Sequence, residues 1–189
     1  MILKKTTFEL RFYIYVFSWQ GRIYWGTAYS NENFNNLSEM YCKENDCSRR
    51  VLLHGSVDVK TFTNLLNDWH KLEVSACGNK LLSIALKQAN IYLVTKSAAY
   101  NWDLCAAHAI IRSIGGRIVD LPRLKAFFDQ HRSLANIDLS QFEIIYNDKL
   151  GNLHFQPKDY ACSPFIAYFN RSDLVDILEY FLINNILIE

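Results

Sequence analysis

An acidic residue at the start of a short apolar helix is the first place where this chain could do chemistry. Asp103 follows Trp102, and apolar residues then recur at helical spacing up to the glycine pair Gly115 and Gly116. The glycine pair predicts a left-handed helix exit, and Asp103 is of the residue type that caps a helix N-terminus. Its carboxylate can cap the helix, or it can hold a cation while the positive helix end faces an anion. The residues alone favour the cap, because an N-cap aspartate is common.

A turn of small residues could bring the backbone close to a ligand. Residues 75–80 read Ser-Ala-Cys-Gly-Asn-Lys, and the predicted helix that follows offers unpaired backbone amides. Lys80 adds a point charge suited to phosphate. A turn before a helix is also an ordinary structure, so this stretch alone is a weak signal.

His108 lies just over one helical turn after Asp103, and imidazole titrates near neutral pH, so a general-base role is conceivable. Its position on the face of the predicted helix that turns toward the core fits better with packing or a buried hydrogen bond. We therefore predict a structural histidine. Asp120 is predicted to end a strand, and the four tryptophans are interpreted as core or lobe-interface residues.

The stretch from Trp102 to Leu121 resembles the carboxy-terminal signature of the lithium-sensitive, magnesium-dependent phosphatases. This family covers the inositol monophosphatases, the inositol polyphosphate 1-phosphatases and the bisphosphate nucleotidases. Its signature reads Trp-Asp, a small apolar helix, Gly-Gly, and then a strand with Asp. Residues 105–109, Cys-Ala-Ala-His-Ala, look most like the inositol polyphosphate 1-phosphatases.

The resemblance implies an activity and a set of site residues. The activity is magnesium-dependent hydrolysis of the 1-phosphate of inositol bisphosphates, so Mg2+ is the implied cofactor and inositol phosphates are the implied small-molecule partners. Asp103 falls on the family's carboxy-terminal metal aspartate. Ala76, Cys77 and Lys80 fall on places that bind the phosphate and ring of the substrate.

Most of the metal ligands that the resemblance requires are missing from this sequence. In the family they come mainly from a Glu and from an Asp-Pro-Ile-Asp-Ser/Thr motif in the other half of the protein, and Asp-Pro occurs nowhere here. One carboxylate cannot satisfy the near-octahedral oxygen coordination of Mg2+. We therefore divide the chain into an unmatched segment, residues 1–18, and a carboxy-terminal phosphatase lobe, residues 19–189. We expect this chain to be inactive alone.

Two other functions stay open. The chain could be a non-catalytic lobe that binds phosphorylated ligands or pairs with another chain through the surface left by the missing lobe, because removing a lobe exposes apolar surface. It could also be a relative of the bisphosphate nucleotidases, against which residues 105–109 argue mildly.

Composition predicts one folded domain. Half of the 189 residues are apolar and 14% are aromatic, while the net charge of +1 predicts no general attraction to nucleic acid or membrane. Five cysteines, an odd number, and the lack of a recognisable signal peptide predict reduced thiols and a cytoplasmic location.

Strands that alternate with helices predict an α/β fold with a mixed sheet flanked by helices. This resembles the carboxy-terminal lobe of the inositol monophosphatase/fructose bisphosphatase-like fold. A hairpin is predicted around residues 20–21 and a loop over residues 31–50. The predicted strands cover residues 12–17, 22–28, 51–54, 91–95, 118–121, 142–146, 153–155 and 165–169. The predicted helices cover residues 59–69, 79–88, 124–131 and 173–182, besides the helix that begins at Asp103.

Overall fold

A five-stranded mixed sheet organises the chain, with strand order β6-β5-β7-β9-β8. In the computed structural model, β5 runs parallel to β6 and β7, whereas β9 runs antiparallel to β7 and β8. The strands are β5 (Arg50–His54), β6 (Trp69–Leu72), β7 (Ile91–Val94), β8 (Arg117–Asp120) and β9 (Phe165–Tyr168). The structure describes residues 16–17, 23–28, 33–37, 50–54, 69–72, 74–96, 99–146 and 160–186.

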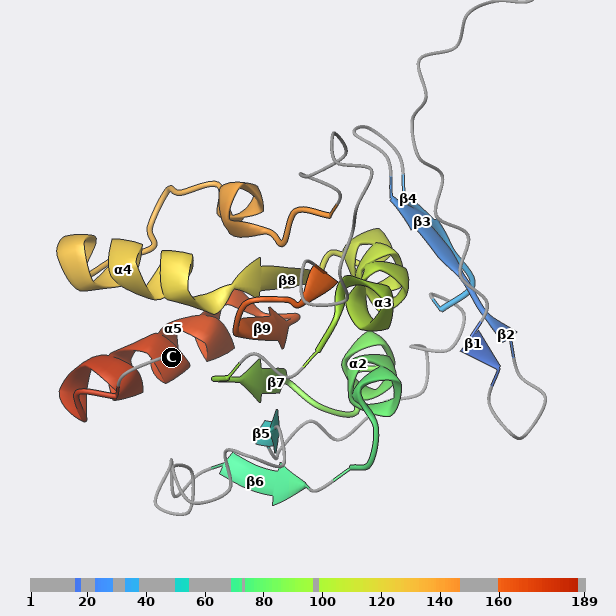
Figure 1. Cartoon of the computed structure of the whole chain (residues 1–189), viewed down its shortest axis with the longest axis horizontal. Helices are drawn as coiled ribbons and strands as arrows, with labels where there is room; N and C mark the ends of the chain where they lie inside the picture. Colours follow the sequence, from blue (N-terminus) through green and yellow to red (C-terminus); the bar gives the residue numbers. More distant parts are fainter. Residues whose placement is uncertain are drawn as a thin grey trace, which may run out of the picture.

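Two pairs of helices cover the two faces of this sheet (Figure 1). One pair is α2 (Cys77–Ala85) and α3 (Asn101–Ser113), and the other is α4 (Leu121–His131) and α5 (Arg171–Ile183). Side chains alternate along each strand, so Leu52 joins the core under α4 and α5 while Leu53 joins the core under α2 and α3. The predicted α/β fold with a mixed sheet is confirmed.

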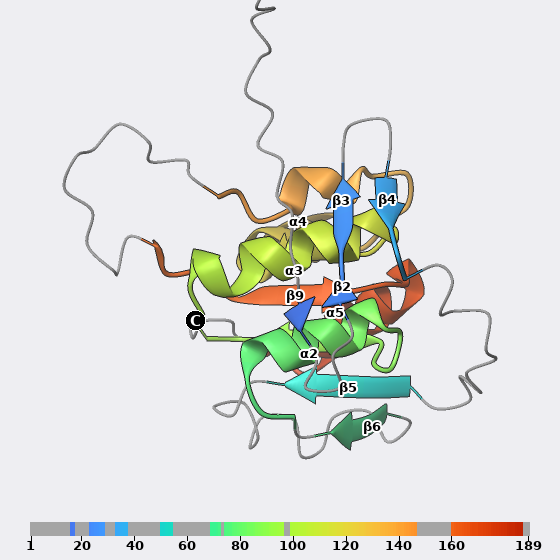
Figure 2. The ribbon, with the colours of Figure 1, turned by 90° about the vertical axis from the view of Figure 1, so that its right-hand side faces the viewer.

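Two short antiparallel pairs form a further layer outside α3. β1 (Val16–Phe17) pairs with β2 (Ile23–Tyr24), which confirms the predicted hairpin, and β3 (Gly26–Ala28) pairs with β4 (Asn33–Asn35). Figure 2 shows β3 and β4 lying across α3. A Cβ at Gly26 would lie 2.3 Å from Ser113 Oγ, so only glycine allows this close approach. The prediction of a loop over residues 31–50 is wrong at residues 33–35, because pairing with β3 overrides their polar composition.

The glycine pair after α3 has two different physical roles. Gly115 adopts a φ of +88°, which confirms the predicted left-handed helix exit. Gly116 is buried, and a Cβ there would lie 2.7 Å from Ile111 Cγ2 and 2.9 Å from the Tyr168 carbonyl oxygen. The second glycine therefore lets the chain pass directly beneath α3 into β8.

The four described α-helices begin two or three residues earlier than predicted. The α4 helix begins at Leu121 rather than Leu124, because Asp120 Oδ1 accepts a hydrogen bond from the Arg123 amide at 2.9 Å and Pro122 is tolerated in the first turn. Asp120 thus ends β8, as predicted, and also caps α4. The α5 helix begins at Arg171, with Asn170 as its N-cap, rather than at Asp173.

Other differences reflect tertiary contacts. Trp69 begins β6 instead of ending a helix, and its buried ring lies 4.3 Å from the Arg50 guanidinium. The predicted strand over residues 142–146 is replaced by a 3-10 helix, η3 (Leu139–Phe142), and a single bridge between Val119 and Glu143. The rest of the predicted helix, residues 59–68, and the predicted strand over residues 153–155 lie outside the described residues. Within the described ranges, no helix is long and apolar enough to cross a bilayer.

A buried carboxylate ties the first turn of α5 to the sheet. Asp173 Oδ1 accepts hydrogen bonds from Arg50 Nε at 3.2 Å and Nη2 at 3.1 Å, and Oδ2 accepts one from Asn90 Nδ2 at 3.0 Å. The Asp173 side chain is only 7% exposed, whereas that of Asp176, which also contacts Arg50, is 40% exposed. A buried charge with several donors stabilises the fold only while every partner is present.

We predict that Asp173→Asn lowers the free energy of unfolding by about 2 kcal/mol, because Arg50 and Asn90 lose the carboxylate that satisfies them. The matched variant Asp176→Asn should cost less than about 1 kcal/mol, since that carboxylate is solvated. Urea denaturation followed by circular dichroism measures both values. Equal losses in the two variants would contradict the role assigned to Asp173.

Candidate functional site

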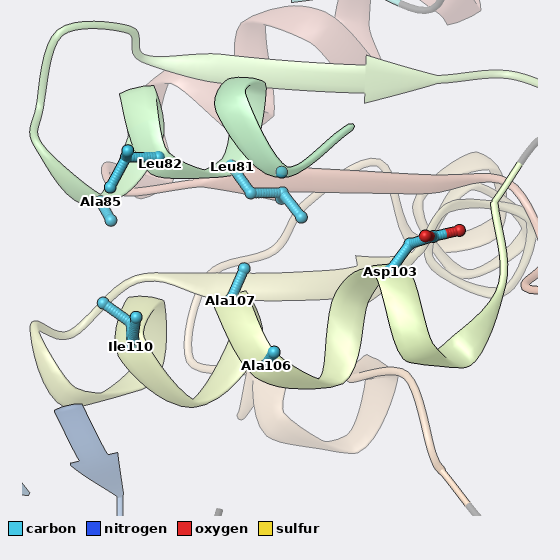
Figure 3. A pocket seen from close by; sticks show the side chains of 8 residues that line it. Leu81, Leu82, Ala85, Asp103, Ala106, Ala107 and Ile110 are labelled. Carbon is cyan, nitrogen blue, oxygen red and sulfur yellow. The ribbon is translucent and has the colours of Figure 1, made fainter. Parts of the chain in front are cut away.

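Helices α2 and α3 lie side by side with their N-termini at the same end (Figures 2 and 3). The reason is the sheet, because α2 follows β6 and α3 follows β7, and both strands run parallel to β5. The N-terminal end of a helix carries a partial positive charge and unpaired amides. Two such ends together favour an anion at this edge of the molecule.

The N-cap residue of α2 offers no side chain to the backbone amides of the first turn. Ala76 occupies the N-cap without a side-chain hydrogen bond, and the first turn contains no acidic residue. Ala76 also adopts a φ of 65° with a ψ of 142°, a conformation that costs on the order of 1–3 kcal/mol for a residue with a Cβ. Ala76 and Gly78 are exposed and Cys77 is half-buried, so this strained turn is open to a ligand.

Lys80 is a buried cation. Its residue is 9% exposed, and its Nζ lies 5.3 Å from the centroid of the Tyr92 ring. Within the part of the chain that the structure describes, no carboxylate forms an ion pair with it. Burial of an uncompensated charge is expensive, and a ring face offsets only part of the cost. This position therefore favours an anionic ligand.

Lys80 and Asp103 both lie near the start of α2, where their charges act on the pKa of the Cys77 thiol. Burial raises the pKa of Cys77, and the negative charge of Asp103 raises it further. A hydrogen bond with Tyr92 and the positive charge of Lys80 lower it. The structure thus brings Asp103 near Cys77 and Lys80, from which it is distant in sequence, with Ala76 directly beside Cys77.

Asp103 does not occupy the N-cap position that the sequence predicted. The N-cap of α3 is Tyr100, and Asp103 is the third helical residue, whose Oδ2 accepts a hydrogen bond from the Tyr100 amide at 2.9 Å. A carboxylate here still satisfies the helix N-terminus, from inside the first turn. Asp103 is exposed, and in Figure 3 its carboxylate points toward the end at which both helices begin.

A groove of about 90 Å³ runs between the two helices behind this carboxylate. Small side chains let the helices approach, and the groove is apolar apart from Asp103 at one end (Figure 3). The lining residues are Gly78, Leu81, Leu82, Ala85, Asp103, Ala106, Ala107 and Ile110.

The described residues do not by themselves form a magnesium site. Among them, no group of three or more His, Cys, Asp or Glu side chains could hold a metal ion. Asp103 offers one carboxylate, and one of its oxygens already accepts the Tyr100 amide hydrogen. Mg2+ requires several oxygen ligands, so Asp103 can contribute to a metal site but not complete one.

His108 is structural, as predicted. The residue is 3% exposed, and its Nε2 accepts a hydrogen bond from the Ile118 amide at 3.4 Å. The proton of the neutral ring is therefore assigned to Nδ1, which donates to the Tyr146 hydroxyl at 3.0 Å. Burial lowers the pKa of His108 to about 3, and the positive charges of Arg112 and Arg117 act in the same direction. A histidine with a pKa this low does not serve as a general base near neutral pH.

The depressed pKa of His108 predicts a pH dependence of stability. Below pH 6.5, the ordinary pKa of histidine, His108 binds a proton in the unfolded chain. In the native protein it binds this proton only near pH 3. Stability is therefore complete above pH 6.5 and falls as the pH drops toward 3, by about 2.5 kcal/mol at pH 4.5.

Replacing His108 with Gln should flatten this dependence, so that the loss of unfolding free energy between pH 7 and pH 4.5 shrinks by about 2 kcal/mol. Urea titrations at the two pH values provide the measurement. His131→Gln, at the exposed end of α4, is the control and should keep the wild-type dependence. An unchanged dependence in His108→Gln would show that other groups cause the acid sensitivity.

Sequence reasoning missed three aromatic residues at this end of the molecule. Tyr92 lies beneath Lys80, and Tyr100 and Tyr160 flank Trp102. The position of Tyr100, directly before the Asn-Trp-Asp signature, could have indicated it from the sequence. Tyr160 is distant in sequence and lies near Trp102 because of the tertiary fold. Buried Trp69 is a core residue, whereas Trp102 is 54% exposed, so for Trp102 the predicted position at a lobe interface stays a prediction.

Comparison with known proteins assigns the class. The sequence profile of the inositol monophosphatase family matches residues 13–147, and this chain belongs to that family.

The relatives include human inositol polyphosphate 1-phosphatase, 28% identical over 120 residues, a match that covers 54% of this chain and 30% of the relative. The bovine enzyme of the same name is 29% identical over 122 residues, with the same coverage. A rat protein, 3'(2'),5'-bisphosphate nucleotidase 1, is 29% identical over 56 residues, covering 30% of this chain and 18% of the relative. The chain thus spans about a third of these curated relatives or less.

Solved structures agree on the fold. An IMPase/NADP phosphatase complexed with Mg2+ and phosphate superposes with a TM-score of 0.50 at 13% identity, covering 84% of this chain and 50% of that one. Staphylococcal inositol monophosphatase-1, from crystals soaked in LiCl, gives a TM-score of 0.51 at 13% identity, covering 87% and 52%. The predicted inositol monophosphatase-type fold is confirmed.

Proposed function

We propose that this chain is the substrate-binding lobe of an inositol monophosphatase-family phosphatase, and that it binds the phosphate of a small molecule where α2 and α3 begin. The observation that carries the proposal is Lys80, a nine-tenths buried ammonium without a carboxylate partner among the described residues. A phosphate would supply the missing negative charge. The open turn at Ala76 and Cys77 would add backbone amides of the α2 N-terminus.

Family membership supports the chemistry of the proposal. The substrate we propose is an inositol bisphosphate, hydrolysed at its 1-phosphate, because the human and bovine relatives are inositol polyphosphate 1-phosphatases. Mg2+ is the proposed cofactor, which would neutralise charge on the phosphate, and Asp103 is the residue we propose as one of its ligands. The remaining ligands would have to come from outside the described residues.

A second candidate function is pairing with another chain. Among the described residues, the β3–β4 pair has two strands, fewer than an independently stable sheet needs, and Phe34 on β4 is 52% exposed. A partner that adds strands here would cover this apolar surface. The two functions are compatible, because a partner lobe could also bring the other metal ligands.

Replacing Lys80 tests the phosphate site. In Lys80→Met, affinity for inositol 1,4-bisphosphate should fall at least about tenfold, because the phosphate loses its buried counter-ion. The free energy of unfolding without ligand should stay the same or rise, since the variant removes an uncompensated buried charge. Isothermal titration calorimetry and urea denaturation measure the two effects.

The control for Lys80 is Lys87→Met at the other end of α2. The Lys87 ammonium also lies over an aromatic ring, 4.1 Å from the centroid of Phe169, but it is remote from the helix N-termini. Its replacement should leave ligand affinity unchanged. If Lys80→Met binds as tightly as the wild type, the proposed phosphate site is wrong.

The 189-residue chain should bind inositol 1,4-bisphosphate without releasing phosphate from it, even with Mg2+ present. One carboxylate at the site cannot hold the ions that ready a water for attack. A colorimetric phosphate-release assay on the wild type and on Asp103→Asn provides the test. Magnesium-dependent release that disappears in Asp103→Asn would show that this chain assembles a working centre by itself.

A further inference from the structure

The groove between α2 and α3 has apolar walls that are open to solvent. Apart from Asp103 at one end, none of its lining residues has a polar side chain (Figure 3). Leu82 on one wall and Ala107 on the other are only half-buried. Water in such a groove finds few hydrogen-bonding partners, so its displacement by an apolar group is favourable.

The groove begins at the proposed phosphate site. Gly78 lines the groove and is also the second residue of α2, in the turn whose backbone amides we propose to bind the phosphate. Leu81, the next wall residue, directly follows Lys80 in the same helix. A ligand can therefore bind its phosphate at the first turn of α2 and extend an apolar group along the groove.

The size of the groove limits what this apolar group can be. An apolar cavity of about 150 Å³ holds benzene, so a groove of about 90 Å³ accommodates a chain of about three or four carbon atoms. The α2 N-terminus and the Lys80 ammonium favour an anionic head group at the groove entrance. At the same end, the proposed Mg2+ would offset the charge of Asp103. These features together select a ligand with an anionic head and a short aliphatic tail.

We propose that the groove between α2 and α3 binds the aliphatic chain of an alkyl phosphate whose phosphate occupies the site at Lys80. The inference rests on the proposed phosphate site, which anchors the head of the ligand. Inositol bisphosphate, the proposed substrate, would occupy the phosphate site without entering the groove, because its hydroxyl groups gain nothing from apolar walls. Alkyl phosphates would thus be a second class of ligand that competes with the substrate.

The test compares butyl phosphate with methyl phosphate, which has the same head group and charge. On the wild-type protein with Mg2+, calorimetry should give at least about tenfold tighter binding of butyl phosphate. Each buried methylene group is worth about fourfold in affinity, and three are added to a groove that is partly open to solvent. In NMR spectra, nuclear Overhauser effects should connect the butyl protons with the methyl groups of Ala106 and Ala107.

Ala106→Leu fills the groove and should abolish the preference for butyl phosphate while methyl phosphate binds as before. Ala126→Leu is the matched control, because Ala126 is an exposed residue of α4, outside the groove, and it should keep the preference. Should Ala106→Leu fail to fold, Ala107→Leu fills the groove from the same helix, and the Overhauser effects of the wild type stand independently of either variant.

The outcomes separate the groove from the phosphate site. Equal affinity for the two ligands would overturn the alkyl-binding groove and leave the phosphate site standing. Binding of neither ligand would overturn the phosphate site, and the groove proposal with it. A preference for butyl phosphate that persists in Ala106→Leu or Ala107→Leu, without Overhauser effects to the alanine methyl groups, would show that the alkyl chain binds elsewhere.

Discussion

The parallel pairing of β5 with β6 and β7 determines the position of the proposed ligand site. Each parallel crossover returns the chain through a helix on the same face, so α2 and α3 begin at the same edge of the sheet. Their positive ends therefore add, and the residues at those ends, Ala76, Cys77, Lys80 and Asp103, meet although more than twenty residues separate the first from the last.

The buried charged side chains of this fold have two kinds of environment, with and without a described partner of opposite charge. Asp173 is satisfied by Arg50 and Asn90, and buried Glu143 contacts Arg117 and, at 3.4 Å, Arg112. Lys80 is as deeply buried, yet within the described residues only an aromatic ring faces its ammonium. Since the buried carboxylates of Asp173 and Glu143 have charged partners, a buried cation that has none among the described residues supports the proposed ligand site beside the two helix N-termini.

Local pattern predicted the elements well where burial follows sequence periodicity. The strands at β5, β7, β8 and β9 and all four described helices were found, because continuous apolar runs and helical spacing mark fully buried segments. The secondary-structure predictions were wrong where a contact with a residue distant in sequence determines the local structure. Trp69 belongs to a strand because β5 pairs with it, and residues 33–35 form a strand because β3 does. The cap of α3 moved to Tyr100 because the Asp103 carboxylate reaches back to the Tyr100 amide.

By itself, the sequence determined the family signature around Asp103, the small-residue turn before Lys80 and the glycine pair, because these depend on residue type and short spacing. It also indicated a structural role for His108, since helical phase turns that residue inward. Only the tertiary structure decided that Lys80 is buried without a carboxylate partner among the described residues, that Tyr160 joins Tyr100 and Trp102, and that Asp103 stands near Cys77. These are properties of neighbours distant in the chain, and solvation and charge pairing exist only after the sheet has brought those neighbours together.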